Sequence, residues 1–310
     1  MFNNPKITFS CVTYNRHKML RNLLLSFVKT NEYDNFEWIV LHHDCTDDTE
    51  NYLNSIIDDS RYSMLKGKLT IIKGYESEYL TFLKNKSIDV STAKKAQFSH
   101  FPKWRNTIIE QMQGKIMIDI PDDHQFIWKG DYCKDIIDVF NDRIEKLGNN
   151  DISTLTFRTR FGYRILKPNN KKSKLIKTKS GVGYFTIDTK KTHDEWHAIA
   201  IDNFKKIDYY PQLEKSDITT KNNWNNSEFY FFHHESMKKS FFEHGLKRAV
   251  LLAPITHDCL DEKYKNLGTS DECIFHIFSS KSELNKHIGK HYRPLAIYEY
   301  ENISKIMKSL

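Results

Sequence analysis

The sequence lacks any apolar run long enough to cross a membrane, which would take about eighteen consecutive apolar residues. Residues 1–6 lack the apolar core of a signal peptide, and strand-like sequence begins directly after them. The five cysteines are odd in number and none lies in a CxxC spacing, so they indicate reduced thiols rather than a disulfide framework. Together these absences predict a cytoplasmic protein without a membrane span.

Signals of several function classes are also missing. No glycine-rich loop follows the first predicted strand, where a nucleotidyltransferase would hold its phosphates. The HxH and HxxxH spacings of binuclear metallohydrolases do not occur beside the acids at 122–123. The formal net charge is +7, but both signs are mixed along the chain and no recognition motif occurs, which argues against nucleic-acid binding. One lysine-rich cluster, at 171–179, leaves contact with an acidic acceptor or a membrane surface open.

The first 130 residues do contain an alternation of strand and helix patterns. Short apolar runs are typical of buried strands, and the segments between them carry apolar residues at helical spacing. Such alternation predicts an α/β fold with a largely parallel sheet and helices on both faces. The predicted strands are 7–13, 38–41, 69–72 and 116–120, and the predicted helices lie around 19–28, 52–57 and 104–112.

Local signals set the ends of these helices. Asn15 is the candidate cap of the first helix, and Thr46 or Asp47 that of the second. Gly114 is predicted to end the third helix. The polar stretch 75–102 is too long for an ordinary connection and predicts a local insertion.

The second half of the chain has a different pattern. A helix is predicted at 132–147, stopped by the glycine that follows it, and then a half-buried strand at 155–165 that turns into a hairpin. Beyond residue 190 the strand signal is low, apart from a buried run at 249–253. Residues 281–310 indicate a helical tail.

Polar side chains gather where the predicted parallel strands end, which is where such sheets bind ligands. The strongest group is Asp122, Asp123 and His124, where an apolar strand stops in two acids and an imidazole. Their oxygen and nitrogen atoms suit Mn²⁺ or Mg²⁺ held partly by substrate phosphates. A polar turn without any ligand has the same composition, because Pro-Asp-Asp is common in turns.

Three blocks taken together resemble the family-2 glycosyltransferases of the GT-A fold. Their order and spacing agree with that family over about residues 6–130, apart from a longer insertion before the third block. The resemblance implies a GT-A (Rossmann-like) α/β fold: a mostly parallel sheet with helices on both faces, a smaller mixed acceptor-side region and a helical C-terminal tail. The blocks are Ile7–Arg16 with its final Val-Thr-Tyr-Asn-Arg, Phe36–Thr49, and Arg105–Asn106 followed by Gly114 and the acidic strand end.

The resemblance also implies an organisation and an activity. Residues 1–130 would form the nucleotide-sugar-binding half of a GT-A domain, 131–260 its acceptor-binding half and 261–310 the C-terminal helical tail. The activity would be metal-dependent, inverting transfer of a sugar from a nucleoside-diphosphate sugar, with a UDP-sugar favoured. The acceptor would be a glycan, a lipid-linked molecule or a protein, and the cofactor Mn²⁺ or Mg²⁺. Inversion is typical of the family, but the sequence leaves open inversion against retention, the donor sugar, the linkage and the oligomeric state.

Individual roles follow from matching positions. The family's second strand normally ends in two acids, but here His42 and His43 stand there and Asp44 follows one place later. Either Asp44 takes over the base contact, or His43 stacks or hydrogen-bonds instead. His257, in a late polar segment, is the candidate third metal ligand, as in some GT-A enzymes. The implied donor-binding residues are Thr13, Tyr14, Arg16, His43, Asp44, Arg105 and Asp122, and the implied metal ligands are Asp122, Asp123, His124 and His257.

The general base that deprotonates the acceptor hydroxyl is sought in the second half. Glu228 lies in a segment that loosely resembles the family's Trp-Gly-x-Glu-Asp block. Asp194 and Glu195 are the other candidates, since they precede an aromatic residue, Trp196, that could stack on a sugar. Three other classes compete: a nucleotidyltransferase, a metallohydrolase acting on phosphate esters, and a non-catalytic sugar-binding protein with a degenerate GT-A fold.

Overall fold

The computed structural model describes residues 1–43, 45–74, 85, 87, 101–157, 175–188, 197–205, 243–251, 253, 255–258 and 277–288. Its elements, in chain order, are β1 (Ile7–Thr13), α1 (His17–Thr30), β2 (Phe36–His43), α2 (Thr49–Ser55), the 3-10 helix η1 (Ser60–Leu65), β3 (Leu69–Gly74), α5 (Phe101–Gln111), β4 (Ile116–Asp119), β5 (His124–Phe126), α6 (Tyr132–Leu147), β6 (Ile152–Thr156), β7 (Leu175–Lys177), β8 (Gly183–Asp188), β9 (His197–Ala200), α8 (Ile201–Lys205), β10 (Lys247–Leu251), β11 (Thr256–Asp258) and α12 (Lys281–Ile288).

The described strands form a nine-stranded sheet in the order β3-β2-β1-β4-β9-β6-β10-β8-β7 and a small sheet of β5 and β11. The first part, β3-β2-β1-β4, is parallel throughout, as the strand–helix alternation predicts. The second part is mixed, because β9 runs antiparallel to both β4 and β6 while β10 is parallel to β6. The α/β fold class implied by the GT-A resemblance is therefore confirmed, and the mixed region continues the same sheet.

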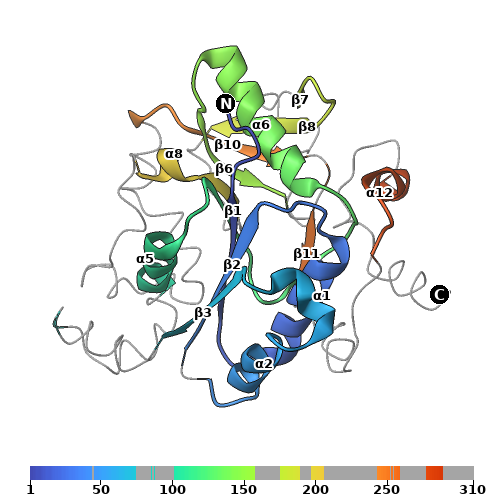
Figure 1. The fold of residues 1–310 in the computed structure, drawn as a ribbon. Helices are drawn as coiled ribbons and strands as arrows, with labels where there is room; N and C mark the ends of the chain where they lie inside the picture. Colours follow the sequence, from blue (N-terminus) through green and yellow to red (C-terminus); the bar gives the residue numbers. More distant parts are fainter. Residues whose placement is uncertain are drawn as a thin grey trace, which may run out of the picture.

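Helices cover both faces of the parallel part of the sheet, also as predicted, with α1 and α2 on one side and α5 on the other (Figure 1). On the first face α1, α2, η1 and α6 enclose strand residues such as Phe9 and Trp38. On the second face Trp104 of α5 packs with Val12 and Leu41. The two cores follow from the period of a strand, in which successive side chains point to opposite faces.

The second half shows strands that the sequence does not predict, namely β8, β9 and β11, and two shifted strands. β9 lies at the centre of the sheet, between β4 and β6, although strand signal beyond residue 190 is low. Its four residues are too few to display an alternating pattern, so pairing on both sides determines its state. β6 begins at Ile152 and β10 at Lys247, each a few residues before the predicted start. The rest of the predicted hairpin, 158–174, lies outside the described residues.

Two predicted helix signals act differently in the structure. Asn15 is not the cap of α1, because Arg16 holds the N-cap position, and the backbone N–H of His17 donates to the Asp47 carboxylate at 3.2 Å. Asn15 instead adopts a left-handed φ of 50° and its Oδ1 accepts a hydrogen bond from the Thr46 N–H at 2.7 Å. Gly114 does not end α5, which stops earlier. A Cβ at Gly114 would lie 2.6 Å from the backbone nitrogen of Thr8, so the close approach to β1 requires glycine.

The cap of the second helix lies one residue later than predicted. Asp48 holds the N-cap position of α2 without a side-chain cap, while Asp47 accepts a hydrogen bond from the backbone N–H of Thr49 at 3.1 Å. The predicted end of the helix at 132–147 is confirmed. Gly148 follows α6 with a left-handed φ of 79°, the conformation that ends many helices. In the predicted tail the structure describes α12, whereas residues 289–310 lie outside the described part of the chain.

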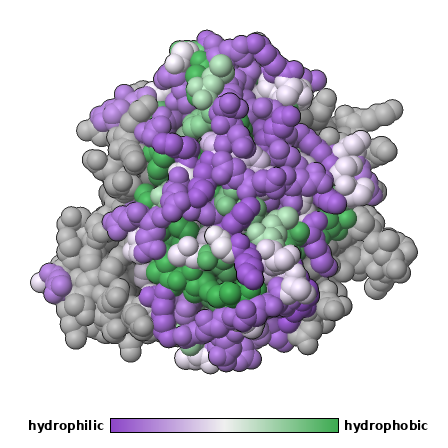
Figure 2. Space-filling view, viewed as in Figure 1, coloured by the Kyte–Doolittle hydropathy of each residue, from purple (hydrophilic) through white to green (hydrophobic). Residues whose placement is uncertain are grey.

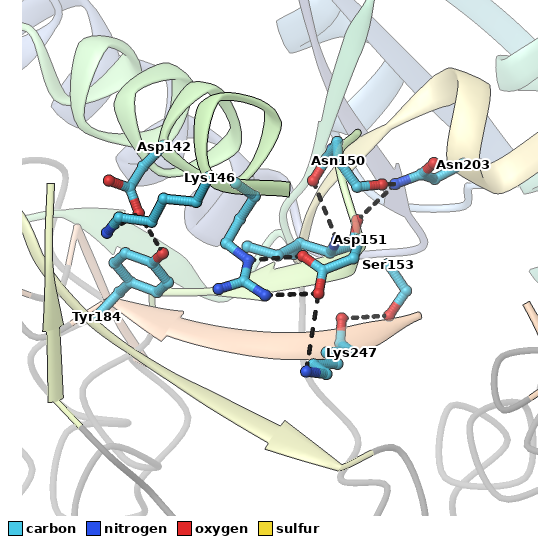
Figure 3. A network of polar contacts seen from close by, with 10 residues as sticks. Asp142, Lys146, Asn150, Asp151, Ser153, Tyr184, Asn203 and Lys247 are labelled. Carbon is cyan, nitrogen blue, oxygen red and sulfur yellow. Dashed lines mark hydrogen bonds and ion pairs between the residues drawn. The ribbon is translucent and has the colours of Figure 1, made fainter. Parts of the chain in front are cut away.

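A buried polar network joins α6 to the mixed part of the sheet (Figure 3). Arg143 donates two hydrogen bonds of 2.6 Å to the two carboxylate oxygens of Asp151, and both side chains are about nine-tenths buried. Asp142 accepts a hydrogen bond of 2.6 Å from the Tyr184 hydroxyl on β8. Asp151 immediately precedes β6, whereas Asp122 and Asp123 come after β4. The strands β4 and β6 run in the same direction, because β9 is antiparallel to both. The network therefore holds the sheet at the edge opposite the acidic strand end.

The surface drawn in Figure 2 is mostly hydrophilic, with hydrophobic residues gathered mainly in its lower half. Among the described residues, few large hydrophobic side chains are exposed, and Tyr14 is one of them at 39% exposure. No helix in the described part of the chain has the length and apolar character needed to span a membrane. The exposed tyrosine stands out because it follows β1 directly, beside the acidic strand end.

Candidate functional site

The acidic turn, which we define as Asp122–His124, lies just after β4 at the carboxyl edge of the parallel strands. Two residues at and just after the end of β1 donate hydrogen bonds to Asp122. The Thr13 hydroxyl donates to Oδ2 at 2.8 Å, and Arg16 Nη1 donates to Oδ1 at 3.0 Å. The same Nη1 atom lies 3.4 Å from Oδ2 of Asp123. The fold thus brings together four of the residues that the sequence assigns to donor or metal binding.

The two acids are buried although they carry charge. Asp122 is 4% exposed and Asp123 is 7% exposed. Burial raises the pKa of Asp122 to about 6, against the opposing charge of Arg16 and with a further contribution from the neighbouring Asp123 carboxylate. Buried acids with a perturbed pKa are typical of sites that bind cations or perform proton chemistry.

His124 completes the turn and has one ring nitrogen without a partner. Its Nδ1 lies 2.7 Å from Oδ1 of Asp123, and since a carboxylate only accepts hydrogen bonds, Nδ1 is the donor. The Nε2 atom is buried and has no hydrogen-bond partner in the described structure. In a neutral ring this nitrogen carries the lone pair that binds metals. A buried histidine oriented by a carboxylate in this way is typical of metal ligands.

A divalent cation fits the chemistry of these groups but not their present arrangement. Carboxylate oxygens suit Mn²⁺ or Mg²⁺, and an imidazole nitrogen suits Mn²⁺. Within the described residues, however, no three His, Cys, Asp or Glu side chains converge as a metal site would require. At the acidic turn the guanidinium of Arg16 contacts both carboxylates.

Three aromatic rings pack together, and one of them, Tyr14, lies in the chain between Thr13 and Arg16, which both contact the acidic turn. The rings of Tyr14 and His43 are stacked, 4.6 Å apart with an interplanar angle of 11°. The rings of His43 and Trp104 are 3.7 Å apart and tilted by 32°. We call Tyr14, His43 and Trp104 the ring stack. His43 contacts both other rings and is 7% exposed, whereas Tyr14 is 39% exposed, so Tyr14 is the outer layer.

His43 is a neutral hydrogen-bonding group in this environment. Burial, with a further contribution from the adjacent His42, lowers its pKa to about 3. A neutral imidazole presents one donor and one acceptor, which allows it to pair with a nucleobase edge. The pKa of His42 is also lowered, mainly by burial. Asp44, the alternative base contact, lies outside the described residues.

Arg105, the chain neighbour of Trp104, makes a buried ion pair. Its Nε donates to Oδ2 of Asp119 at 2.6 Å, and each side chain is 3% exposed. Ser10 donates to the other oxygen of Asp119 at 2.9 Å. Arg105 follows Trp104 on α5, so this pair fixes the helix turn that carries the third ring of the stack. A direct contact of Arg105 with a pyrophosphate stays a prediction.

The segment that contains His257 pairs through its backbone with the strand that begins at His124. β11 pairs with β5, which places His257 opposite Gln125 and Asp258 opposite His124. This brings the backbone of the predicted third ligand to the strand that continues the acidic turn, and a role of its side chain in metal binding stays a prediction. The described residues do not include the candidate bases Glu228, Asp194 and Glu195. Of the lysine-rich cluster they include only 175–179.

Sequence reasoning misses two members of the site. The helical pattern assigns Trp104 only to the buried face of its helix, yet this residue contacts His43 as the third ring of the ring stack. The apolar run 116–120 hides Asp119 inside a buried strand, yet this residue anchors Arg105. A signal for Asp119 is present, because an acid inside an apolar run requires a buried partner. For Trp104 the sequence carries no comparable signal, since large aromatic residues on helices usually fill cores.

Comparison with protein-family models and with curated proteins finds no match. Among solved structures, S. aureus TarS 1–349 in complex with UDP is 14% identical, with a TM-score of 0.47, covering 81% of this chain and 60% of that one. S. aureus TarS is 14% identical at a TM-score of 0.47, covering 92% and 44%. The mannosyltransferase PcManGT from Pyrobaculum calidifontis, in complex with GDP-Man and Mn²⁺, is 15% identical at a TM-score of 0.39, covering 69% and 50%. The chain thus spans less than two thirds of the length of each.

Proposed function

We propose that the protein is a glycosyltransferase that takes its sugar from a nucleoside-diphosphate sugar. The observation that carries the proposal is the joint placement of the acidic turn, Thr13, Arg16 and the ring stack at the carboxyl edge of parallel strands. Ligands of such sheets bind at this edge. The sequence resemblance to family-2 glycosyltransferases supports the same assignment, because its three blocks are the segments that meet here.

Each part of the site has a task that suits a nucleotide sugar. Tyr14, the exposed outer ring, would stack on the nucleobase, while the edge of neutral His43 would hydrogen-bond it. Asp122 and Asp123 would lie near the diphosphate and, with His124, hold a divalent cation. That cation would offset the negative charge that develops on the leaving diphosphate. A UDP-sugar is the donor that the resemblance favours.

The acceptor side is proposed from the sequence alone. Glu228, or else Asp194 or Glu195, would remove the proton from the acceptor hydroxyl as the sugar transfers with inversion. The acceptor would be a glycan, a lipid-linked molecule or a protein. In this scheme 1–130 form the donor half, 131–260 the acceptor half and 261–310 the helical tail, and the protein works in the cytoplasm.

A thermal-shift screen tests the proposal. UDP, GDP, CMP, TDP and their sugars are added singly, each with and without Mn²⁺. We expect one nucleotide to raise the melting temperature only when Mn²⁺ is present, since binding to the native state at about 100 times Kd adds about 2.7 kcal/mol of stability. The exposed Asp58, which follows α2, provides a matched control as Asp58→Asn beside Asp123→Asn.

The outcomes separate the competing classes. A shift that disappears in Asp123→Asn but persists in Asp58→Asn supports transfer from a nucleotide sugar. Stabilisation by nucleoside triphosphates rather than by nucleotide sugars, in a second plate, would favour a nucleotidyltransferase. If no nucleotide shifts the melting temperature under any condition, the proposal fails and a degenerate sugar-binding module or a metallohydrolase takes its place.

A further inference from the structure

All the carboxylate oxygens of the acidic turn already have protein partners. Thr13 and Arg16 each take one oxygen of Asp122, at 2.8 Å and 3.0 Å. His124 and Arg16 each take one oxygen of Asp123, at 2.7 Å and 3.4 Å. Arg16 Nη1 is therefore the atom that touches both carboxylates. It contacts oxygens that a cation bound between the two acids would also need.

The arginine resolves an electrostatic problem that the fold creates. Two adjacent carboxylates, both nearly buried, repel one another and cost free energy unless a positive charge lies close to them. A guanidinium is permanently charged, so it neutralises this pair at any physiological pH. A divalent cation would perform the same task. Both cations cannot bind the same two oxygens at once, because they would compete for the same lone pairs and repel each other.

Arg16 is also placed so that its side chain can leave the acids. It holds the N-cap position of α1, where its backbone carbonyl accepts the first helical hydrogen bond, from Leu20 at 3.0 Å. Its side chain is 40% exposed, in contrast to the acids it contacts. Rotation of the side chain therefore leaves the backbone hydrogen bond that begins the helix in place. Arginine binds phosphate groups well, so a diphosphate beside the acidic turn would offer the guanidinium a new partner.

We propose that Arg16 is the resident cation of the acidic turn and is exchanged for a divalent metal ion when a nucleoside diphosphate binds. The metal alone must displace the guanidinium, so it binds weakly. The diphosphate accepts the displaced guanidinium, so metal and diphosphate strengthen each other's binding. This exchange rests on the proposed function for its physiological ligand, but the competition between Arg16 and the metal does not depend on it.

Binding of Mn²⁺ alone is the direct test, measured by the loss of the free-ion signal in electron paramagnetic resonance. Arg16→Met removes the charge and keeps an unbranched side chain, while Lys29→Met removes an equal charge from the exposed far end of α1. We expect Arg16→Met to bind Mn²⁺ about tenfold more tightly than the wild type, within the range of coupled sites. Lys29→Met is expected to match the wild type, and so is Arg16→Lys, which keeps a cation near the acids.

A second titration measures the coupling. With UDP present, the affinity of the wild type for Mn²⁺ is expected to rise by about tenfold or more, and that of Arg16→Met by much less. Equal or weaker binding of Mn²⁺ alone by a folded Arg16→Met, or the absence of Mn²⁺ binding in every variant, would overturn the exchange. If Arg16→Met tightens Mn²⁺ binding while UDP binds to no variant, the competition stands and the nucleotide-sugar function fails. The two conclusions are thus distinguishable.

Discussion

The ring of Tyr14 lies almost parallel to that of His43, with 4.6 Å between their centroids. Because Tyr14 is the outer ring and is partly exposed, we expect it to be the surface on which a nucleobase stacks. Tyr14→Ala should weaken nucleotide binding by about 1–3 kcal/mol, the usual cost of losing an aromatic ring under a base. Tyr14→Phe keeps the ring and should bind nearly as the wild type does. Isothermal titration with the nucleotide found in the screen measures both variants, and equal affinity of Tyr14→Ala and wild type would remove Tyr14 from the base site.

The buried imidazole of His43 should make the protein sensitive to acid. Its pKa is about 3 in the folded protein against an ordinary value of 6.5, so between these values the unfolded chain binds a proton that the folded chain does not. Stability from this group is therefore complete above pH 6.5 and is lost as pH falls toward 3, by about 1.4 kcal/mol per pH unit at most. The pKa of Asp122 is raised from its ordinary value of 3.8 to about 6. Between these pH values the folded chain holds a proton that the unfolded chain has lost, so the stability from this group falls as pH rises.

A comparison of variants isolates the effect of His43. Urea unfolding at about pH 7.5, 6 and 5 should show that His43→Phe gains stability relative to the wild type as pH falls, by about 1 kcal/mol per unit. His244→Gln, at an exposed position, is the control and should follow the wild type. Parallel pH profiles of His43→Phe and the wild type would show that His43 is not held neutral by the fold.

Asp123 contacts both Arg16 and His124 and lies at the centre of the acidic turn. Asp123→Asn keeps the shape and one acceptor oxygen but removes the charge that a metal requires. We expect a loss of Mn²⁺ affinity of at least about 100-fold in the presence of nucleotide, because even residues outside the ligand shell cost about 10–100-fold. The melting temperature without ligand should change little, as the residue is not part of the apolar core. A variant that fails to fold would assign the acidic turn a structural task instead.

The ion pair of Arg143 and Asp151 should determine stability rather than activity. Asp151→Asn leaves a buried guanidinium without its charge partner, which typically costs about 3–5 kcal/mol. Glu145→Gln is a matched control nearby, because its partner Lys179 is exposed and such surface pairs contribute about 1 kcal/mol or less. Chemical denaturation compares the two. Similar small losses in both variants would contradict the assignment of the network as a clamp on the mixed sheet.

Much of the first half can be predicted because its signals are local. The bounds of β1 match the apolar run 7–13, and α1, β2, β3 and β4 fall where the alternation of patterns places them. Burial on both faces of a parallel strand requires a continuous apolar run, and a helix packed on one face requires spacing of three and four. The acidic turn is equally visible, since two acids that end an apolar strand must serve a ligand or a turn.

What the sequence determined by itself was the α/β class, the parallel half of the sheet and the edge at which polar residues collect, because these depend on the periodicity of neighbouring residues. Only the tertiary structure decided that β9 lies between β4 and β6, that Trp104 closes the ring stack and that Arg16 bridges the two acids. These features join residues far apart in the chain. Their physical causes are strand pairing, ring packing and buried charge, which exist only once distant segments are in contact.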